Sequence, residues 1–144
     1  MNSGQPSANV QQSEGTGETI LVVDDQQIVL QATVAILQRA GYNVLGALTG
    51  AEAKDICDRR QAPIHLLLTD LLMPGIDGPE VVRSVKAIDP RVRIVYMSGY
   101  PRDMLADRGI LLDRDSDFLA KPFTPAGLKS KIREVLDRSQ RAGA

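Results

Sequence analysis

Cysteine and histidine are the scarcest reactive residue types in this 144-residue chain, which has one copy of each. A lone cysteine excludes an internal disulfide. Cys57 is interpreted as a reduced thiol of the core rather than a nucleophile, because only one histidine could activate it. That histidine, His65, directly precedes the apolar centre of a predicted strand, and we interpret it as structural.

Long apolar runs and a strong excess of one charge are missing as well. No apolar run reaches the roughly 18 residues of a membrane span, and residues 1–17 lack the basic and apolar regions of a signal peptide. Charged residues make up 24% of the chain and nearly cancel, with a net charge of −1. We therefore expect a cytoplasmic protein that contacts neither nucleic acid nor membrane.

The length is sufficient for one folded domain of ordinary size. Residues 1–17 are rich in Ser, Gly, Gln and Asn, with Val10 as the only sizeable apolar side chain, so they are predicted to form a disordered lead-in or linker. The folded domain is predicted over residues 18–140, followed by a flexible C-terminus at 141–144. Internal repeats are absent.

Short apolar runs alternate regularly with helical patterns along the domain. The runs predict strands at residues 19–24, 42–47, 64–70, 92–97 and 117–120, and the first is continuously apolar, which is typical of a strand covered on both faces. Apolar stripes with helical spacing and helix-capping residues predict helices at 26–40, 49–60, 79–88, 101–108 (short and weak) and 124–138. This order predicts a doubly wound α/β fold, a five-stranded parallel sheet with helices on both faces.

Polar side chains stand where four of the predicted strands end. The first strand delivers Asp24 and Asp25, the third Asp70, the fourth Ser98 and the fifth Lys121. Parallel α/β sheets bind ligands at this edge, and these side chains converge if the first strand lies between the second and third. Three close carboxylates repel one another unless a cation joins them, and a purely oxygen ligand set favours Mg²⁺. Asp70 would then be a nucleophile that accepts a phosphoryl group as an acyl phosphate.

Each of these residues also has a simpler interpretation. Asp24 and Asp25 could cap a helix and favour its first turn. Asp70 could hydrogen-bond its own turn, Ser98 could be ordinary loop chemistry before Gly99, and Lys121 could be a solvated charge. Their joint appearance at strand ends favours the phosphoacceptor interpretation.

The motifs "VVDD", "LLTDLLMPGIDG", "YMSGY" and "FLAKPF", in this order and spacing, make the chain resemble a response-regulator receiver domain of two-component signalling. The resemblance implies a flavodoxin-like (βα)5 fold with strand order 2-1-3-4-5. It also implies that Asp24 and Asp25 hold Mg²⁺ together with Asp70 and the backbone carbonyl of Leu72, and that Asp70 is the phosphorylation site.

The same resemblance assigns roles to the last two motifs. Ser98 and Lys121 would contact the phosphoryl group, and Ser98 would move as part of a switch. Phe118 occupies the place of an aromatic switch residue, although a plain core role is equally open. The Lys121–Pro122 peptide is expected to be cis, which is cheap only before proline.

The sequence departs from the family pattern at two places. Asp115 and Ser116 stand where many members have a Gly-Ala pair, which makes the approach to the last strand long and charged. Gln26 and Gln27 follow the acidic pair, where an additional acid is common. The second change removes negative charge near the metal without removing a ligand.

The resemblance implies a phosphoacceptor served by a histidine kinase or a histidine phosphotransfer domain, because this chain has no convincing phospho-donor histidine. We expect a monomer that catalyses only its own phosphorylation and dephosphorylation, without a DNA-binding output domain after the last helix. A free-standing regulator and the receiver of a hybrid sensor kinase both remain open.

Two other classes of function are open as alternatives. A phosphatase of the haloacid-dehalogenase type would need Asp-x-Asp rather than adjacent acids, and a cap domain. A degenerate receiver acting as a protein-binding scaffold would not need the complete set of five polar residues.

Overall fold

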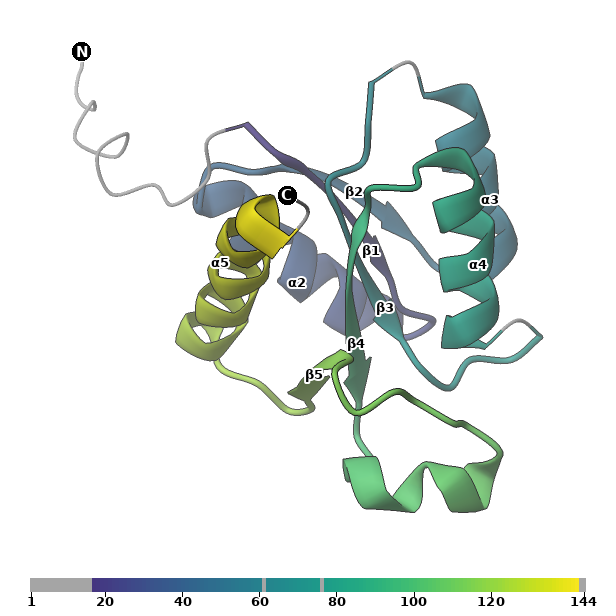
Figure 1. Cartoon of the computed structure of the whole chain (residues 1–144). Helices are drawn as coiled ribbons and strands as arrows, with labels where there is room; N and C mark the ends of the chain where they lie inside the picture. The colour runs from purple at the N-terminus through teal and green to yellow at the C-terminus, as the bar shows by residue number, and fades with distance from the viewer. Residues whose placement is uncertain (1–16, 61, 76, 143–144) are drawn as a thin grey trace, which may run out of the picture.

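The computed structural model describes residues 17–60, 62–75 and 77–142. Its five strands form one sheet in the order β2-β1-β3-β4-β5, and every neighbouring pair is parallel (Figure 1). The strands are β1 (Thr19–Val23), β2 (Asn43–Ala47), β3 (Leu66–Asp70), β4 (Arg93–Ser98) and β5 (Asp117–Ala120). The predicted fold class and strand order are confirmed. The predicted lead-in lies outside the described residues, apart from Gly17.

Helices cover both faces of this sheet (Figure 1). The helices α2 (Gln27–Arg39) and α5 (Pro125–Ala142) lie on one side, and α3 (Gly50–Arg59) and α4 (Gly78–Ile88) on the other. Helix α5 continues two residues beyond the predicted domain end at 140, because its Ser-Gln-Arg-Ala end contains no helix breaker.

The core is split into two layers by the alternation of side chains along the central strands. Every residue of β1 and β3 is buried. Ile20 and Leu68 face the layer closed by α2 and α5, whereas Leu21 and Leu67 face the layer under α3 and α4. The continuous apolar runs of the sequence therefore correspond to strands covered on both faces, as predicted.

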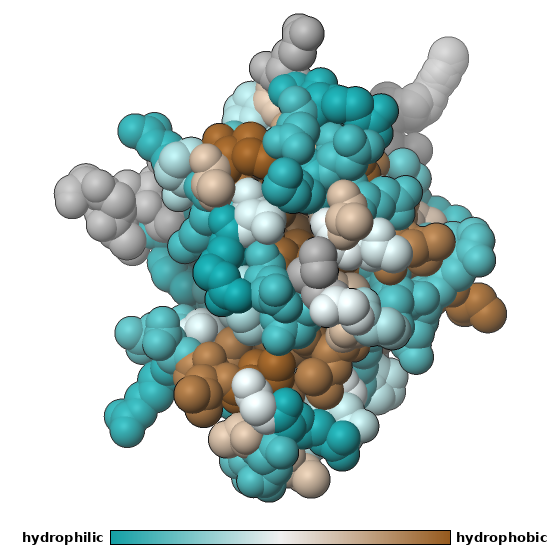
Figure 2. All heavy atoms as spheres, turned by 90° about the vertical axis from the view of Figure 1, so that its right-hand side faces the viewer, coloured by the Kyte–Doolittle hydropathy of each residue, from teal (hydrophilic) through white to brown (hydrophobic). Residues whose placement is uncertain are grey.

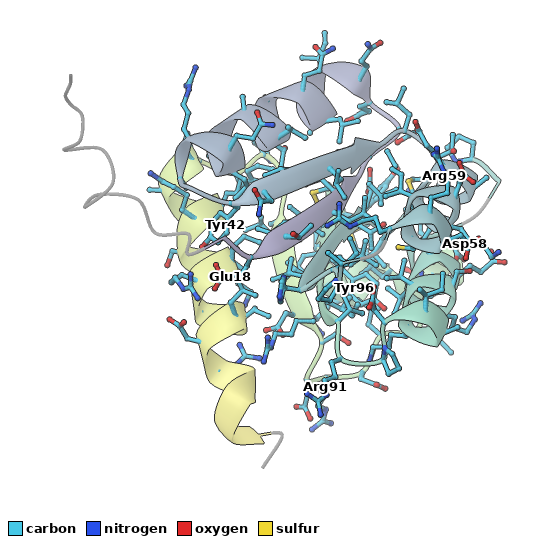
Figure 3. The ribbon with its side chains drawn as sticks, turned by 90° about the horizontal axis from the view of Figure 1, so that it is seen from above. Glu18, Tyr42, Asp58, Arg59, Arg91 and Tyr96 are labelled. Atoms are coloured by element: carbon cyan, nitrogen blue, oxygen red, sulfur yellow. The ribbon has the colours of Figure 1, made fainter. Side chains whose placement is uncertain are left out.

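Helix α5 is also tied to the beginning of the sheet by Arg133. Its guanidinium lies 3.0 Å from a carboxylate oxygen of Glu18 and donates to the Tyr42 hydroxyl at 3.3 Å. Figure 3 shows Glu18 and Tyr42 beside one another next to α5. The contact holds the last helix against the residues that precede β1 and β2, 115 and 91 residues away in sequence.

The start of α4 is fixed more strongly than the sequence interpretation indicated. Asp77 and Glu80 form a capping box, which the Pro79-based prediction missed. Gly78 packs so closely on the end of β3 that an added Cβ would lie 2.7 Å from the Asp70 carbonyl oxygen. The capped turn therefore determines where the chain after Asp70 runs.

The weak helix predicted at 101–108 is the main difference from expectation. The structure has two short 3-10 helices there, η1 (Arg102–Met104) and η2 (Ala106–Arg108), in place of one continuous helix. Leu105, the residue between them, is the apolar side chain that the segment buries, and Gly109 ends it with a φ of 82°. One anchor cannot stabilise a longer amphipathic helix.

The two 3-10 helices cover only part of the apolar side chains next to them. Leu71, Tyr96, Leu105 and Ile110 form a third cluster, whose partly exposed neighbours include Phe118. In Figure 2 an apolar band lies between the helices and the 3-10 segment below them.

The two scarce residues have the structural roles that were predicted. Cys57 is buried, and burial raises the pKa of its thiol to about 11, with smaller contributions from Asp89 and Asp58. His65 accepts a hydrogen bond from the Thr19 backbone N–H through Nδ1 at 2.9 Å. The Cys57 thiol therefore stays protonated at neutral pH.

Candidate phosphoacceptor site

The parallel pairing of β1 and β3 brings two aspartates to the same edge of the sheet. Val23 is in register with Thr69, so the residues that follow, Asp24 and Asp70, lie side by side. Asp24 is fully buried and Asp70 is 7% exposed, whereas Asp25 is exposed. Two carboxylates are therefore held in a largely dehydrated place, which is costly without a compensating charge.

Lys121 supplies part of that charge from the end of β5. Its Nζ lies 2.8 Å from Oδ2 of Asp24 and donates a hydrogen bond to Oδ2 of Asp70 at 3.0 Å. The following peptide bond, Lys121–Pro122, is cis. The ammonium thus reaches across the β4 strand to both acids.

The site shifts the pKa values of Asp70 and Lys121 in the same direction. Burial raises the pKa of Asp70, and its hydrogen bond with Lys121 only partly opposes this, while the negative Asp24 adds to the rise. Burial alone would lower the pKa of Lys121, but the two carboxylates outweigh it and raise the pKa. Lys121 therefore stays protonated. Its positive charge does not fully offset the cost of burying the negative charge of Asp70.

The acidic side chains are also arranged to hold a metal ion. Oxygen atoms of Asp24, Asp25 and Asp70 all lie within 4.8 Å of one another. Oδ2 of Asp24 is buried and has the Lys121 ammonium as its ion-pair partner. Three carboxylates with a single ammonium beside them, in an all-oxygen cluster, fit a hard divalent cation such as Mg²⁺. The partly buried Leu72 follows the cluster in the adjacent loop.

Ser98 ends β4 between the acids and Lys121. It is 2% exposed, its Oγ accepts the Tyr100 backbone N–H at 2.9 Å, and its carbonyl accepts the Lys121 N–H at 2.8 Å. The hydroxyl is therefore positioned by the loop after β4, and the backbone of Ser98 is connected directly to the strand that carries Lys121. All five residues predicted at the strand ends are brought to one edge.

Arg102 is a residue whose role the sequence interpretation missed. Its guanidinium donates to the backbone carbonyl oxygens of Asp113 (3.1 Å), Arg114 (3.4 Å) and Ser116, and lies over the Phe118 ring at 5.4 Å. The unusual charged approach to β5 is thus held by one cation. No sequence pattern marks such backbone acceptors, because any residue type supplies them.

Phe118 is half-buried and packs against the third apolar cluster as well as under Arg102. Its contacts are those of a core residue that also borders the segment connecting β4 and β5. Both roles considered for Phe118 are compatible with this position.

Comparison with known proteins places this geometry in a family. The family model described as "Response regulator receiver domain" matches residues 20–133. The chain therefore belongs to the response-regulator receiver domain family, as the motifs indicated, and the haloacid-dehalogenase alternative is set aside.

Two curated relatives and one solved structure illustrate the similarity. The sensor kinase CckA of Brucella abortus is 32% identical over 120 residues, which are 83% of this chain and 13% of that protein. The response regulator receiver protein CpdR of the same organism is 33% identical over 81% of this chain and 95% of its own length.

The structure is the receiver domain of the sensor histidine kinase PA1611 from Pseudomonas aeruginosa. It has 27% identity and a TM-score of 0.70, covering 85% of this chain and 99% of that one, and carries a magnesium ion coordinated in the active site cleft. Receiver domains work with histidine kinases or phosphotransfer proteins, so the signalling class of this chain is established. In the part of the chain that the structure describes, no helix is long and apolar enough to cross a membrane.

Proposed function

We propose that the chain is a phosphoacceptor that takes a phosphoryl group from a phosphohistidine onto Asp70. The observation that carries the proposal is the contact of Lys121 with both Asp24 and Asp70 at the carboxyl ends of the strands. A phosphoryl group in transfer spreads negative charge over its oxygens and needs cations and donors around it. Lys121 and Ser98 are the chain's own groups placed to supply them.

In the reaction an Asp70 carboxylate oxygen attacks phosphorus, and the bond from phosphorus to the donor nitrogen breaks. Asp70 gains an acyl phosphate, and the donor histidine, which carries a proton on its other ring nitrogen, keeps the electron pair and leaves as a neutral imidazole. Asp24, Asp25, Asp70 and the Leu72 carbonyl would hold Mg²⁺, which supplies positive charge to the phosphoryl oxygens when bound. The ammonium of Lys121 remains the fixed cation on the other side.

The surroundings of the reaction are part of the same proposal. The donor would be a histidine kinase or a histidine phosphotransfer domain in the cytoplasm, and the domain would act as a monomer. It would catalyse only its own phosphorylation and dephosphorylation. The phosphoryl group brings about 1.5 to 2 negative charges, which Ser98 and Phe118 would convert into altered binding of a partner.

The test is labelling with a small phosphodonor. Acetyl phosphate and Mg²⁺ should add one phosphoryl group, detected by intact-mass spectrometry and removed by hydroxylamine. EDTA should abolish the labelling, and Asp70→Asn should remain unmodified. The matched control is Asp115→Asn, an exposed loop acid, which should be labelled like the wild type. Full labelling of Asp70→Asn, or none of the wild type, contradicts the proposal; the latter is expected of a degenerate scaffold.

A further inference from the structure

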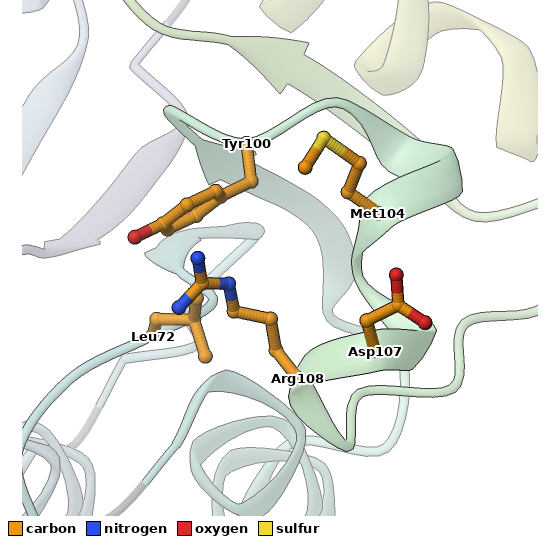
Figure 4. Close-up of a pocket in the computed structure, with 5 residues that line it drawn as sticks. All are labelled: Leu72, Tyr100, Met104, Asp107 and Arg108. Carbon is orange, nitrogen blue, oxygen red and sulfur yellow. The ribbon is translucent and has the colours of Figure 1, made fainter.

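A pocket beside the acceptor edge has no role in the reaction described so far. It is lined by Leu72, Tyr100, Met104, Asp107 and Arg108 (Figure 4). The lining comes from the loop after β3, the loop after β4 and the 3-10 segment. Two of its five residues carry a full charge, so the pocket is suited to a polar ligand.

Arg108 is the cation of this pocket. Its guanidinium lies 4.0 Å from the centroid of the Tyr100 ring, a distance at which an aromatic face attracts a cation. Within the described residues the Arg108 side chain has no carboxylate partner and donates no hydrogen bond, and in Figure 4 the carboxylate of Asp107 points away from it. The ring therefore holds a guanidinium whose donors remain available to a ligand.

The pocket borders the acceptor edge through two of its lining residues, Leu72 and Tyr100. Leu72 follows Asp70 by two residues, and Tyr100 is fixed to Ser98 by its backbone N–H. In Figure 4 the Arg108 guanidinium lies between the Tyr100 ring and Leu72. Arg108 is thus a cation in a pocket formed by the two loops that follow the strands carrying Asp70 and Ser98.

We infer that Arg108 is a specificity-determining residue that binds a carboxylate leaving group, which makes acyl phosphates preferred small-molecule donors of this domain. The inference rests on the proposed function, since it concerns the donor side of the same reaction. The planar guanidinium pairs with a carboxylate through two parallel hydrogen bonds. Tyr100 acts as the positioning residue, because its ring holds the guanidinium in place.

The charge of the leaving group explains why Arg108 should speed phosphorylation by one donor and not by the other. With acetyl phosphate the Asp70 oxygen forms a bond to phosphorus, the bond from phosphorus to the acetyl oxygen breaks, and acetate departs with the electron pair and a negative charge. With phosphoramidate the bond from phosphorus to nitrogen breaks and the already protonated nitrogen leaves as neutral ammonia. Arg108 stabilises the developing negative charge in the first reaction and has none to stabilise in the second.

The experiment measures initial phosphorylation rates of the full chain with each donor at saturating Mg²⁺. Arg108→Gln should lower the ratio of the acetyl phosphate rate to the phosphoramidate rate by roughly fivefold, the effect of one unit charge at hydrogen-bonding distance in a hydrated site. Arg108→Lys should retain part of the ratio. Arg114→Gln, which removes the same charge from an exposed position in the neighbouring loop, should keep the wild-type ratio.

A second measurement does not depend on catalysis. In the metal-free protein, titration with sodium acetate should shift the Nε–Hε NMR signal of Arg108, whereas sodium chloride at equal ionic strength should not. An unchanged rate ratio in Arg108→Gln, an equal fall with both donors, or the same fall in Arg114→Gln overturns the inference. A wild type labelled by neither donor contradicts the proposed function itself.

Discussion

At the scale of single residues, the acceptor edge holds an electrostatic conflict that one ammonium does not remove. Asp24 and Asp70 share Lys121, and burial still raises the pKa of Asp70. A carboxyl whose pKa is higher in the folded than in the unfolded chain stabilises the fold only below its unfolded pKa, and this contribution is lost as pH rises through the folded pKa. At neutral pH, Asp70 therefore costs stability in the metal-free protein.

Replacing Asp70 by Asn should remove this cost. In EDTA at pH 7 we expect Asp70→Asn to raise the free energy of unfolding by about 1 kcal/mol, for unit charges a few ångströms apart in a partly hydrated site. The gain should shrink as pH falls toward the ordinary carboxyl value, where wild-type Asp70 is protonated as well. Urea unfolding across this pH range measures it. An Asn variant that is less stable at pH 7, or equally improved at every pH, would show that Asp70 is an ordinary turn residue.

At the scale of elements, the junction between β3 and α4 positions the acceptor loop. A methyl group at Gly78 would meet the Asp70 carbonyl oxygen at 2.7 Å and the Leu71 Cα at 2.9 Å, both backbone atoms that cannot rotate away. We expect Gly78→Ala to lower the free energy of unfolding by about 2 kcal/mol, the range of an overpacked site. It should also slow phosphorylation, because the backbone of the acceptor residue must move.

Gly99 provides the matched control for this substitution. A Cβ at Gly99 would have no atom within 4 Å, so Gly99→Ala should change the unfolding midpoint little. Urea unfolding of both variants, with labelling rates from acetyl phosphate, makes the comparison. Equal stability of the two variants would mean that the close approach at Gly78 does not restrict the acceptor loop.

At the scale of the whole molecule, the acceptor edge is connected to the segment between β4 and β5. Ser98 is bonded through its backbone to Lys121, and Arg102 ties η1 to the approach to β5 and to Phe118. The two short 3-10 helices of this segment bury one apolar side chain, Leu105, and Ile110 follows them. A segment with few buried apolar contacts can shift without unfolding the domain.

Beryllofluoride with Mg²⁺, which stands in for the phosphoryl group on Asp70, should therefore shift amide NMR signals throughout residues 98–122. The same addition to Arg102→Gln should leave smaller shifts at residues 110–118, because the connecting cation is gone, while Arg114→Gln should respond like the wild type. Signals that change only in the loops after β1 and β3 would show that the occupied site does not reach this segment.

Much of the fold follows from short-range patterns in the sequence. The runs around Leu21 and Leu67 are long enough for strands and apolar on both sides, and helices start at recognisable caps such as Thr49. The ends of these strands then place Asp24 and Asp70 at one edge, because parallel strands share their direction. The segment at 101–108 could not be predicted in the same way, because a single buried leucine does not define a period.

The sequence by itself determined the layered α/β architecture and the set of acids, hydroxyl and ammonium at the sheet edge. Apolar periodicity and the residues at strand ends are local properties, so they can be read directly from the order of residues. Only the tertiary structure decided that Lys121 contacts both Asp24 and Asp70, that Arg102 holds the approach to β5 through backbone carbonyls, and that Arg108 lies on Tyr100. These contacts join segments that come together in space after folding. Backbone carbonyls and aromatic faces are common to many residues, so their pairing is specified by distance and orientation and leaves no pattern in the sequence.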